Sequence, residues 1–313
     1  MLAYTPDGKK IVGANLKMIG LGIDDSIALY WWDRASGEKS KPMLHDNFVR
    51  DIRINRDGTL AATNCMDKSV QVWDLNTAEA VSPSLNFQKG YCQDFEFNPT
   101  KDALVTAFGT IKEVTNWDYR NGNPRFQPLR FQALPVWLDF HPDGNTLAIA
   151  TKGDGTVRFL NDQSLRPDTI RLQGTAPDYL RFNEQGTVLA TVSKSPLTAS
   201  ERFSHGVAQL WDSQTLEMLG PIFTTPRPLA KTFLDPKTRF VAMTDHTGTV
   251  TVHKLVKDTR SLQTINDLVD VLSGHRVGAN WNLVPLSSDQ FNEVWQRVKN
   301  QHPETKTDSY APQ

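Results

Sequence analysis

The sequence is poor in the features that mark membrane, secreted and metal-binding proteins. Only two of its 313 residues are cysteines, Cys65 and Cys92, which is too few for a disulfide framework or a cysteine-based metal site. No apolar run approaches the roughly 20 residues that a membrane helix needs. The amino terminus, MLAYTPDGKK, lacks the apolar core of a secretory signal. We therefore expect a cytoplasmic protein that does not associate with membranes.

The chain also lacks an excess of either charge. It has 34 Lys and Arg against 35 Asp and Glu, which gives a formal net charge of −1. Nucleic-acid-binding proteins usually carry a basic excess that attracts phosphates. We therefore expect no nucleic-acid partner.

Catalytic signatures are missing as well. There is no phosphate-binding loop, no His-Glu-x-x-His helix and no Gly-x-Ser-x-Gly turn, and the seven histidines are dispersed. None of them stands at metal-ligand spacing from a second His or Cys. We expect no catalytic residues, no metal and no cofactor, and hence a protein that is not an enzyme.

What the sequence does contain is a repeat of six related units. Each unit runs through a short alternating stretch, a turn such as Asp143-Gly144, and two further β-like stretches. The turn position recurs with a period of roughly 42 to 52 residues, which is typical of a β-propeller blade. The units are Leu2–Asp33, Ile52–Thr77, Asp94–Gly122, Leu138–Asp162, Tyr179–Thr215 and Lys231–Leu255.

Three strands are visible in each unit, and the segments between units can supply a fourth. These segments are Lys41–His45, Val81–Phe87, Arg125–Phe131 and Thr169–Leu172. The predicted fold class is therefore all-β: a β-propeller of about six four-stranded blades, with a short C-terminal helical appendage.

Four units end in Trp-Asp, and this pattern resembles the WD-repeat family. The pairs are Trp32-Asp33, Trp73-Asp74, Trp117-Asp118 and Trp211-Asp212, whereas the other two units have Leu160-Asn161 and His253-Lys254. The resemblance implies that each Trp supports a buried hydrogen-bond network with a turn Asp and an upstream His. Asp67 and Asp154 stand at the turn position, and only His45 suits the histidine position. We expect the network to be incomplete in most blades.

Pro-then-apolar joints between units, such as Lys41–His45, resemble those of large bacterial proteins in which a kinase precedes a WD propeller. Propellers of this family usually borrow an outer strand from the amino terminus to close the ring. Here Met1–Tyr4 already aligns with the innermost strand of the first unit. We therefore expect the sixth blade to lack an outer strand, the ring to be open or incompletely closed, and the chain to be the C-terminal part of a longer protein.

The tail departs from the repeat. Leu262, Ile265, Leu268, Val269 and Leu272 have helical spacing, and Gly274 suits the helix end. A second helix begins at Ser287 or Ser288, presents Phe291, Val294, Trp295 and Val298 on one face, and ends at Pro303. The predicted domains are a propeller over 1–256, a two-helix appendage over 257–303 and a disordered tail over 304–313.

Two long insertions, Leu16–Ser26 and Ser193–Gly206, both fall between the second and third strands of a blade and so decorate the same face. Binding residues are often carried by loops on a rigid frame. We predict a partner-binding rim on this face, formed by Met18, Ile19, Lys194, Arg202, Phe203 and His205.

The leading functional hypothesis is a non-enzymatic scaffold for a protein or peptide, forming the binding or sensory part of a larger signalling protein. The alternative is a propeller enzyme, a lyase or hydrolase with its site on the central axis. Carboxylates and histidines converging at the axis would favour that alternative.

Overall fold

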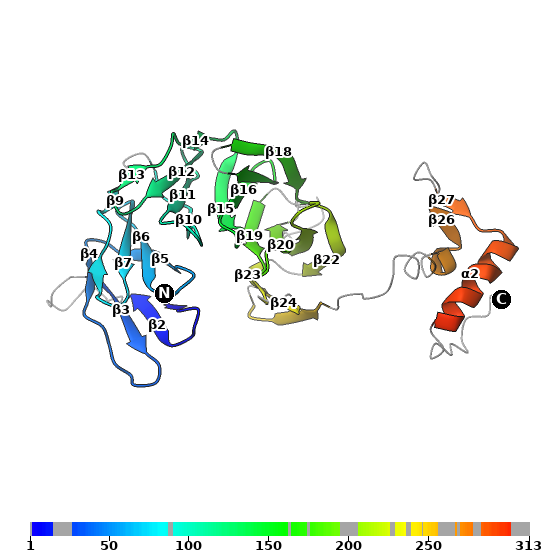
Figure 1. Ribbon diagram of the computed structural model, residues 1–313, viewed down its shortest axis with the longest axis horizontal. Helices are drawn as coiled ribbons and strands as arrows, with labels where there is room; N and C mark the ends of the chain where they lie inside the picture. Colours follow the sequence, from blue (N-terminus) through cyan, green and yellow to red (C-terminus); the bar gives the residue numbers. More distant parts are fainter. Residues whose placement is uncertain are drawn as a thin grey trace. The chain divides into compact units, whose positions relative to one another are not determined.

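Six antiparallel sheets follow one another along the chain in this computed structural model, coloured from blue to yellow in Figure 1. The structure describes residues 2–14, 27–86, 90–161, 164–173, 176–194, 206–225, 229–235, 239–245, 247–255, 267, 270–277 and 283–301. The chain divides into two compact units, Met1–Leu255 and Val256–Gln313. The all-β fold class is confirmed.

The first three sheets have four or five strands each. Sheet 1 consists of β1 (Leu2–Tyr4), β2 (Lys10–Ala14), β3 (Ile27–Asp33) and β4 (Met43–His45). Sheet 2 consists of β5 (Val49–Ile54), β6 (Leu60–Cys65), β7 (Ser69–Asp74), β8 (Glu79–Ala80) and β9 (Leu85–Asn86). Sheet 3 consists of β10 (Asp94–Phe97), β11 (Leu104–Phe108), β12 (Glu113–Asp118), β13 (Asn123–Pro124) and β14 (Leu129–Arg130).

The next three sheets have four, four and three strands. Sheet 4 consists of β15 (Leu134–Phe140), β16 (Thr146–Lys152), β17 (Thr156–Asn161) and β18 (Ser164–Arg171). Sheet 5 consists of β19 (Ala176–Phe182), β20 (Val188–Lys194), β21 (Gly206–Asp212) and β22 (Met218–Thr225). Sheet 6 consists of β23 (Leu229–Leu234), β24 (Phe240–Asp245) and β25 (Val250–Lys254). The outer strands of sheets 1 to 4 lie in or beside the segments that the sequence analysis proposed for them.

Asp-Gly turns join the first two strands of several sheets. In sheet 2, the Asp57 carboxylate accepts a hydrogen bond from the Thr59 amide at 3.0 Å, and Gly58 has a φ of +75°. A side chain strains the backbone at such a φ, so glycine is favoured there. The same turn recurs with Gly8 and Gly144, whose φ angles are +69° and +72°.

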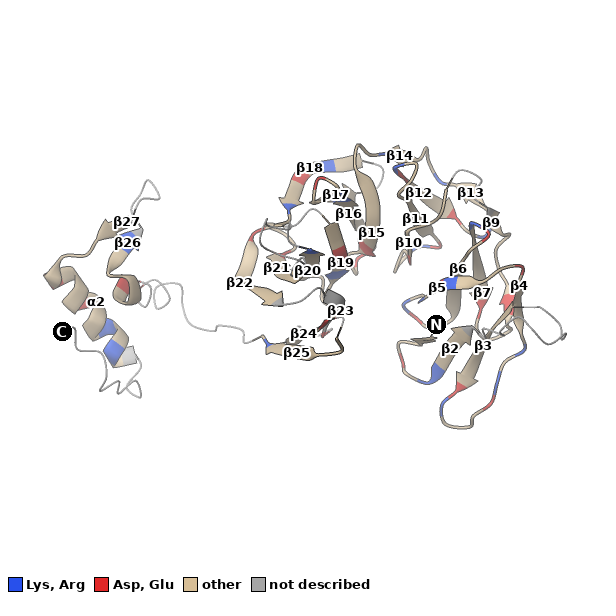
Figure 2. Cartoon of the chain, turned by 180° about the vertical axis from the view of Figure 1, so that it is seen from behind, with Lys and Arg blue, Asp and Glu red and all other residues tan. Residues whose placement is uncertain are grey.

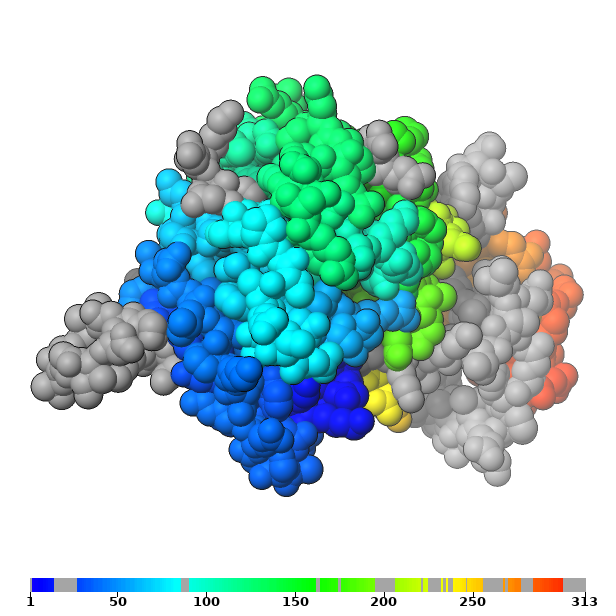
Figure 3. Space-filling view, turned by 60° about the vertical axis from the view of Figure 1, so that its left-hand side comes forward, coloured from blue at the N-terminus to red at the C-terminus, as the bar shows by residue number. Residues whose placement is uncertain are grey.

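Apolar side chains fill the space between consecutive sheets. Each of five core clusters joins one sheet to the next; the cluster between sheets 2 and 3, for example, contains Val70 and Val72 from β7 together with Phe95 and Phe97 from β10. Figure 3 shows the corresponding surface passing from blue through cyan to green without interruption. The alternating pattern of the strands therefore serves two interfaces, because the two faces of each middle sheet meet different neighbours.

The first and sixth sheets differ from the middle four. Leu2 and Tyr4 on β1 are 68% and 59% exposed, and Val250 and Val252 on β25 are 58% and 59% exposed. Among the described residues, β25 has no strand on its outer side. No core cluster of described residues joins sheet 6 to sheet 1.

The second unit contains the predicted second helix and a β-hairpin that was not predicted. Helix α2 (Ser288–Gln301) is capped by Ser287, whose Oγ accepts from the Gln290 amide at 3.3 Å. Val294 and Val298 are buried, while Trp295 on the same predicted face is 37% exposed. Strands β26 (His275–Val277) and β27 (Leu283–Pro285) form the hairpin. No described helix has the length and apolarity needed to cross a membrane.

Of the first predicted helix, residues 270–273 are helical, and Gly274 follows them with a φ of +68°. Leu272 is 85% exposed, so its place on a buried helix face was wrong. Leu262, Ile265, Leu268 and Val269 lie outside the described residues, as do Pro303 and the predicted disordered tail.

Candidate functional site

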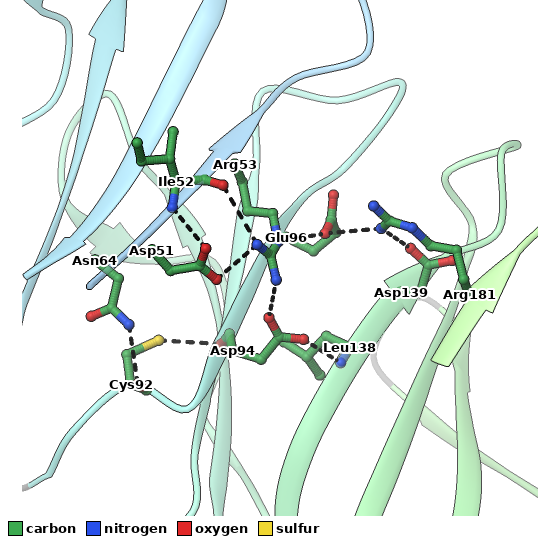
Figure 4. Close-up of polar contacts among 10 residues, drawn as sticks. All are labelled: Asp51, Ile52, Arg53, Asn64, Cys92, Asp94, Glu96, Leu138, Asp139 and Arg181. Carbon is green, nitrogen blue, oxygen red and sulfur yellow. Dashed lines mark hydrogen bonds and ion pairs between the residues drawn. The ribbon is translucent and has the colours of Figure 1, made fainter. Parts of the chain in front are cut away.

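Charged side chains occupy the same position on the innermost strands of the four middle sheets. Each of these residues lies opposite the same position on the second strand of its own sheet. The four residues are Arg53 on β5, Glu96 on β10, Asp139 on β15 and Arg181 on β19. Asp51 and Asp94 lie two residues earlier on β5 and β10, and therefore on the same face. We call these six residues the inner-strand network (Figure 4).

Arg53 forms the centre of one half of the network. Its guanidinium lies 2.7 Å from the Asp51 carboxylate, 3.0 Å from Asp94 and 3.5 Å from Glu96. Its side chain is 22% exposed, and that of Asp94 is 3% exposed. Sheets 2 and 3 are thus joined by ion pairs that are largely shielded from water.

The buried aspartates also bind the backbone of the next sheet. Asp94 Oδ2 accepts a hydrogen bond from the Leu138 amide at 2.7 Å, and Asp139 Oδ2 accepts one from the Phe182 amide at 2.6 Å. The remaining oxygen of each carboxylate meets a guanidinium, Arg53 for Asp94 and Arg181 for Asp139. Each aspartate therefore connects its own sheet to the following one through a charge-assisted hydrogen bond.

Arg181 completes the chain of contacts. One of its nitrogens, Nη1, lies 2.8 Å from Asp139 Oδ1 and 3.4 Å from Glu96 Oε2. Glu96 thus meets Arg53 from sheet 2 and Arg181 from sheet 5. The network therefore spans four consecutive sheets.

Four carboxyl groups share two guanidinium groups in this network, and this imbalance affects their protonation. Burial raises the pKa of Asp94 to about 7, and burial raises the pKa of Asp139 to about 6. The arginines oppose both shifts, while Glu96 adds to them because like charges repel. The aspartates can therefore hold protons near neutral pH.

The geometry limits what these carboxyl groups can do chemically. Both oxygens of Asp94 and both oxygens of Asp139 already have hydrogen-bond partners. A cavity of about 200 Å³ lies at the turn end of the strands and is lined partly by Glu96, Asp139 and Arg181. Among the described residues, no group of three or more His, Cys, Asp and Glu is arranged to hold a metal ion.

A second polar arrangement lies between the sheets. In sheet 2, the Trp73 indole donates to Thr63 Oγ1 at 3.1 Å, and His45 Nε2 lies 2.8 Å from the same oxygen. His45 Nδ1 lies near the Met43 carbonyl rather than an aspartate. Asp67 instead accepts from Ser69 within its turn. The expected network of Trp, His and Asp is thus present without its Asp link.

The same Trp-to-Thr hydrogen bond recurs in two other sheets. Trp117 donates to Thr106 at 2.8 Å, and Trp211 donates to Thr191 at 2.9 Å. In sheet 4, where Leu160 replaces Trp, Ile149 stands in the place of the Thr. Asp154 there pairs with Arg158 at 2.8 Å. Sheet 4 therefore lacks this hydrogen bond, because buried apolar residues replace both its donor and its acceptor.

The aspartates of the Trp-Asp pairs shape exposed turns. Asp74 Oδ1 accepts from the amides of Asn76 and Thr77, at 2.6 and 3.1 Å. Similar contacts are made by Asp33, Asp118 and Asp212. Trp32 lies on β3, and its ring centroid is 5.9 Å from that of Tyr30.

Comparison with known proteins agrees with this geometry. The family described as WD40, "WD domain, G-beta repeat", matches residues 41–74 and 134–161. These two segments are therefore similar to WD repeats. It is 28% identical over 154 residues to the methylosome protein WDR77 of Xenopus laevis, covering 47% of this chain and 45% of that protein.

Two further relatives show the same pattern. Eukaryotic translation initiation factor 3 subunit I of Bombyx mori is 31% identical over 156 residues, covering 44% of this chain and 45% of that protein. Protein HIR1 of Candida albicans is 23% identical over 267 residues, covering 75% of this chain and 28% of that protein. The chain thus spans less than half the length of each of these relatives.

Most of the predicted partner-binding residues fall outside the described structure, namely Met18, Ile19, Arg202, Phe203 and His205. Lys194 is described and ends β20, where its Nζ lies 3.3 Å from the Asp178 carboxylate. This ion pair partly neutralises the charge that the proposed basic rim would use. The prediction for the other five residues stays untested.

The sequence analysis missed the inner-strand network. Its signal was present, because a charged residue stands three positions before the turn in each of the four middle units. Alternation shows which residues share a strand face but not which sheets that face meets, so it does not indicate that Arg53, Glu96, Asp139 and Arg181 contact one another. Only the packing of neighbouring sheets reveals that they meet one another.

Proposed function

We propose that this WD-repeat chain is a non-enzymatic scaffold that binds a protein or peptide partner. The observation that carries the proposal is that the buried aspartates of the inner-strand network have hydrogen-bond partners at both carboxylate oxygens. These two carboxylates use all their oxygens to connect neighbouring sheets, which suits a rigid frame better than a reactive centre. Acidic and basic residues are intermingled along the strands of the compact unit Met1–Leu255 (Figure 2). This mixture of charges suits a protein partner better than nucleic acid.

The relatives support the same proposal. One is named as a methylosome protein and another as a subunit of a translation initiation factor, and both names place those proteins in assemblies. A scaffold role in a complex is therefore the expectation that we carry over to this chain. We further propose that it acts in the cytoplasm as the binding part of a larger signalling protein.

For the partner-binding face we propose the side that carries the two insertions. One insertion connects β2, which ends at Ala14, to β3, which starts at Ile27; the other connects β20 to β21. Both join the second strand of a sheet to the third, so they emerge at equivalent ends of their sheets. Arg202 and Phe203 provide a cation and an aromatic ring, residue types that often anchor protein interfaces.

The test compares the wild-type chain with the double variant Arg202→Ser/Phe203→Ser. Proteins captured by each chain are quantified by mass spectrometry, and the binding constant of the main partner is then measured with purified components. We expect the double variant to bind at least about tenfold more weakly, because such anchors contribute more than about 1.4 kcal/mol. The matched control is Arg166→Ser/Phe126→Ser, outside both insertions. Equal binding by wild type and the double variant would remove the proposed face.

A second candidate function is an enzyme that acts near the inner strands. The observation that favours it is the raised pKa of Asp94 and Asp139, because a carboxyl group protonated near pH 7 can act as a general acid. A screen with chromogenic esters and glycosides tests this candidate. Turnover that disappears in Asp139→Asn, with folding intact, would favour the enzyme over the scaffold.

A further inference from the structure

The interface between sheets 3 and 4 differs from its neighbours at two facing positions. In sheets 2, 3 and 5, a Trp stands on the third strand opposite an apolar residue of the second strand: Trp73 opposite Ala61, Trp117 opposite Leu104 and Trp211 opposite Leu189. These indoles pack toward the preceding sheet. In sheet 4, Leu160 stands at this position, opposite Leu147. A smaller side chain therefore faces sheet 3.

The second difference lies on the sheet 3 side of the same interface. On the third strand, the residue directly before the Trp position packs against the following sheet. It is apolar in sheets 2, 4 and 5, where it is Val72, Phe159 and Leu210. In sheet 3 this position is Asn116. Its Oδ1 is buried and accepts no hydrogen bond from the described residues. A buried amide oxygen without a partner is unfavourable, so a ligand that donates a hydrogen bond to it is stabilised.

A cavity lies where these two substitutions meet. It measures about 540 Å³, within the range of about 300–1,000 Å³ that is common for small-molecule sites. Its apolar lining includes the buried residues Ala103, Val105, Leu147 and Leu160. The inner part of the cavity can therefore accept an apolar group of a ligand.

The charge of the lining has one sign. Lys101 and Arg125 are exposed residues of the lining, and no Asp or Glu among the described residues contributes to it. Arg125 Nη2 donates to the Asp102 carbonyl at 2.8 Å, which fixes the guanidinium, while the Asp102 carboxylate is engaged by Arg120 and Tyr119. An acidic group of a ligand can therefore approach Arg125 without meeting a carboxylate of the lining.

We propose that this cavity binds a small amphipathic organic acid. The apolar body of the ligand lies between Val105 and Leu160, a hydroxyl or N–H group donates to Asn116 Oδ1, and the acidic group lies beside Arg125 and Lys101. This proposal does not rest on the proposed scaffold function, because it uses only described residues of sheets 3 and 4 and of the turns beside them.

The test uses two dyes that share an apolar body and an N–H group. 8-Anilinonaphthalene-1-sulfonate carries an acidic group, and N-phenyl-1-naphthylamine lacks it. Binding of each dye to the full chain is followed by fluorescence and calorimetry. We expect the sulfonate to bind at a single site and more tightly than the neutral dye, because only the sulfonate pairs with Arg125.

Three variants locate the site. Leu160→Trp fills the cavity and lowers the affinity for both dyes by at least about tenfold. The double variant Leu160→Trp/Ile149→Thr gives the indole the threonine partner that it has in the other sheets, and serves if the single variant folds poorly. Arg125→Gln weakens the sulfonate by about fivefold to tenfold and changes the neutral dye less than twofold.

Dyes of this kind also bind exposed apolar faces, so the control is Val250→Ser/Val252→Ser on sheet 6. This variant keeps the affinity of the cavity for both dyes. Any of three results overturns the proposal: no binding to the wild-type chain, unchanged binding to both cavity-filled variants, or equal losses for both dyes in Arg125→Gln.

Discussion

The four middle sheets and the two terminal sheets are built from the same repeat, but they are held in different ways. Each middle sheet contacts a neighbour on both faces, and its innermost strand carries a charged residue of the inner-strand network. At the equivalent position, sheet 1 has Ala3 and sheet 6 has Phe233. Equivalent residues therefore contribute differently to stability, according to which neighbours surround them.

The largest expected effect is the loss of Asp94. Asp94→Ala leaves the buried Arg53 guanidinium without its closest sheet 3 partner and the Leu138 amide without an acceptor. Removing one member of a buried ion pair costs about 3–5 kcal/mol of unfolding free energy. Urea unfolding measures this loss of unfolding free energy. The matched change in a terminal sheet, Asp33→Ala, removes only exposed turn contacts and should cost about 1 kcal/mol or less. Similar losses for the two variants would contradict the comparison.

The second largest expected effect is the truncation of Val72, which we compare with the equivalent residue Val252. Val72 in sheet 2 is fully buried under sheet 3, whereas Val252 in sheet 6 is 59% exposed. We expect Val72→Ala to lower the unfolding free energy by about 2–3 kcal/mol and Val252→Ala by less than about 0.5 kcal/mol. Both are measured by urea unfolding. A large cost at Val252 would show that its face is covered in solution.

The pH dependence of stability separates the network from the rest of the fold. Because the folded state raises the pKa of Asp94 to about 7 and that of Asp139 to about 6, it binds protons more tightly than the unfolded chain, whose aspartates titrate near 3.9. Stability from these groups therefore falls as pH rises from about 4 to about 7 and is constant above that. We expect the free energy of unfolding to be clearly lower at pH 7 than at pH 5.

Asp94→Asn removes the Asp94 titration and keeps an acceptor for the Leu138 amide. Unfolding of this variant at a series of pH values should show a clearly smaller slope between pH 5 and pH 7. The control, Asp212→Asn, changes a turn residue that accepts only from nearby backbone amides and should keep the wild-type slope in that range. An unchanged slope in Asp94→Asn would assign the pH dependence to other groups.

The sequence was sufficient to predict the sheets because each repeat carries its own turn and its own alternation. Asp57-Gly58 and the strands around it depend on local chemistry, and so does the Ser287 cap of α2. The inner-strand network was not predictable in this way. Arg53 and Glu96 are far apart in sequence, and their meeting depends on how two sheets pack. The cavity at Leu160 was missed for the same reason, since its other wall comes from Asn116.

The smallest effect concerns the Trp-to-Thr hydrogen bond. Trp73→Phe keeps most of the ring but removes the N–H that donates to the fully buried Thr63, so we expect a loss of about 1 kcal/mol. The terminal counterpart is Trp32→Phe, because the Trp32 indole makes no hydrogen bond among the described residues; its cost should stay below about 0.5 kcal/mol. Thermal unfolding of both variants measures the difference. If Trp32→Phe proves as costly as Trp73→Phe, the indole acts through its ring contacts, and the hydrogen bond does not distinguish middle from terminal sheets.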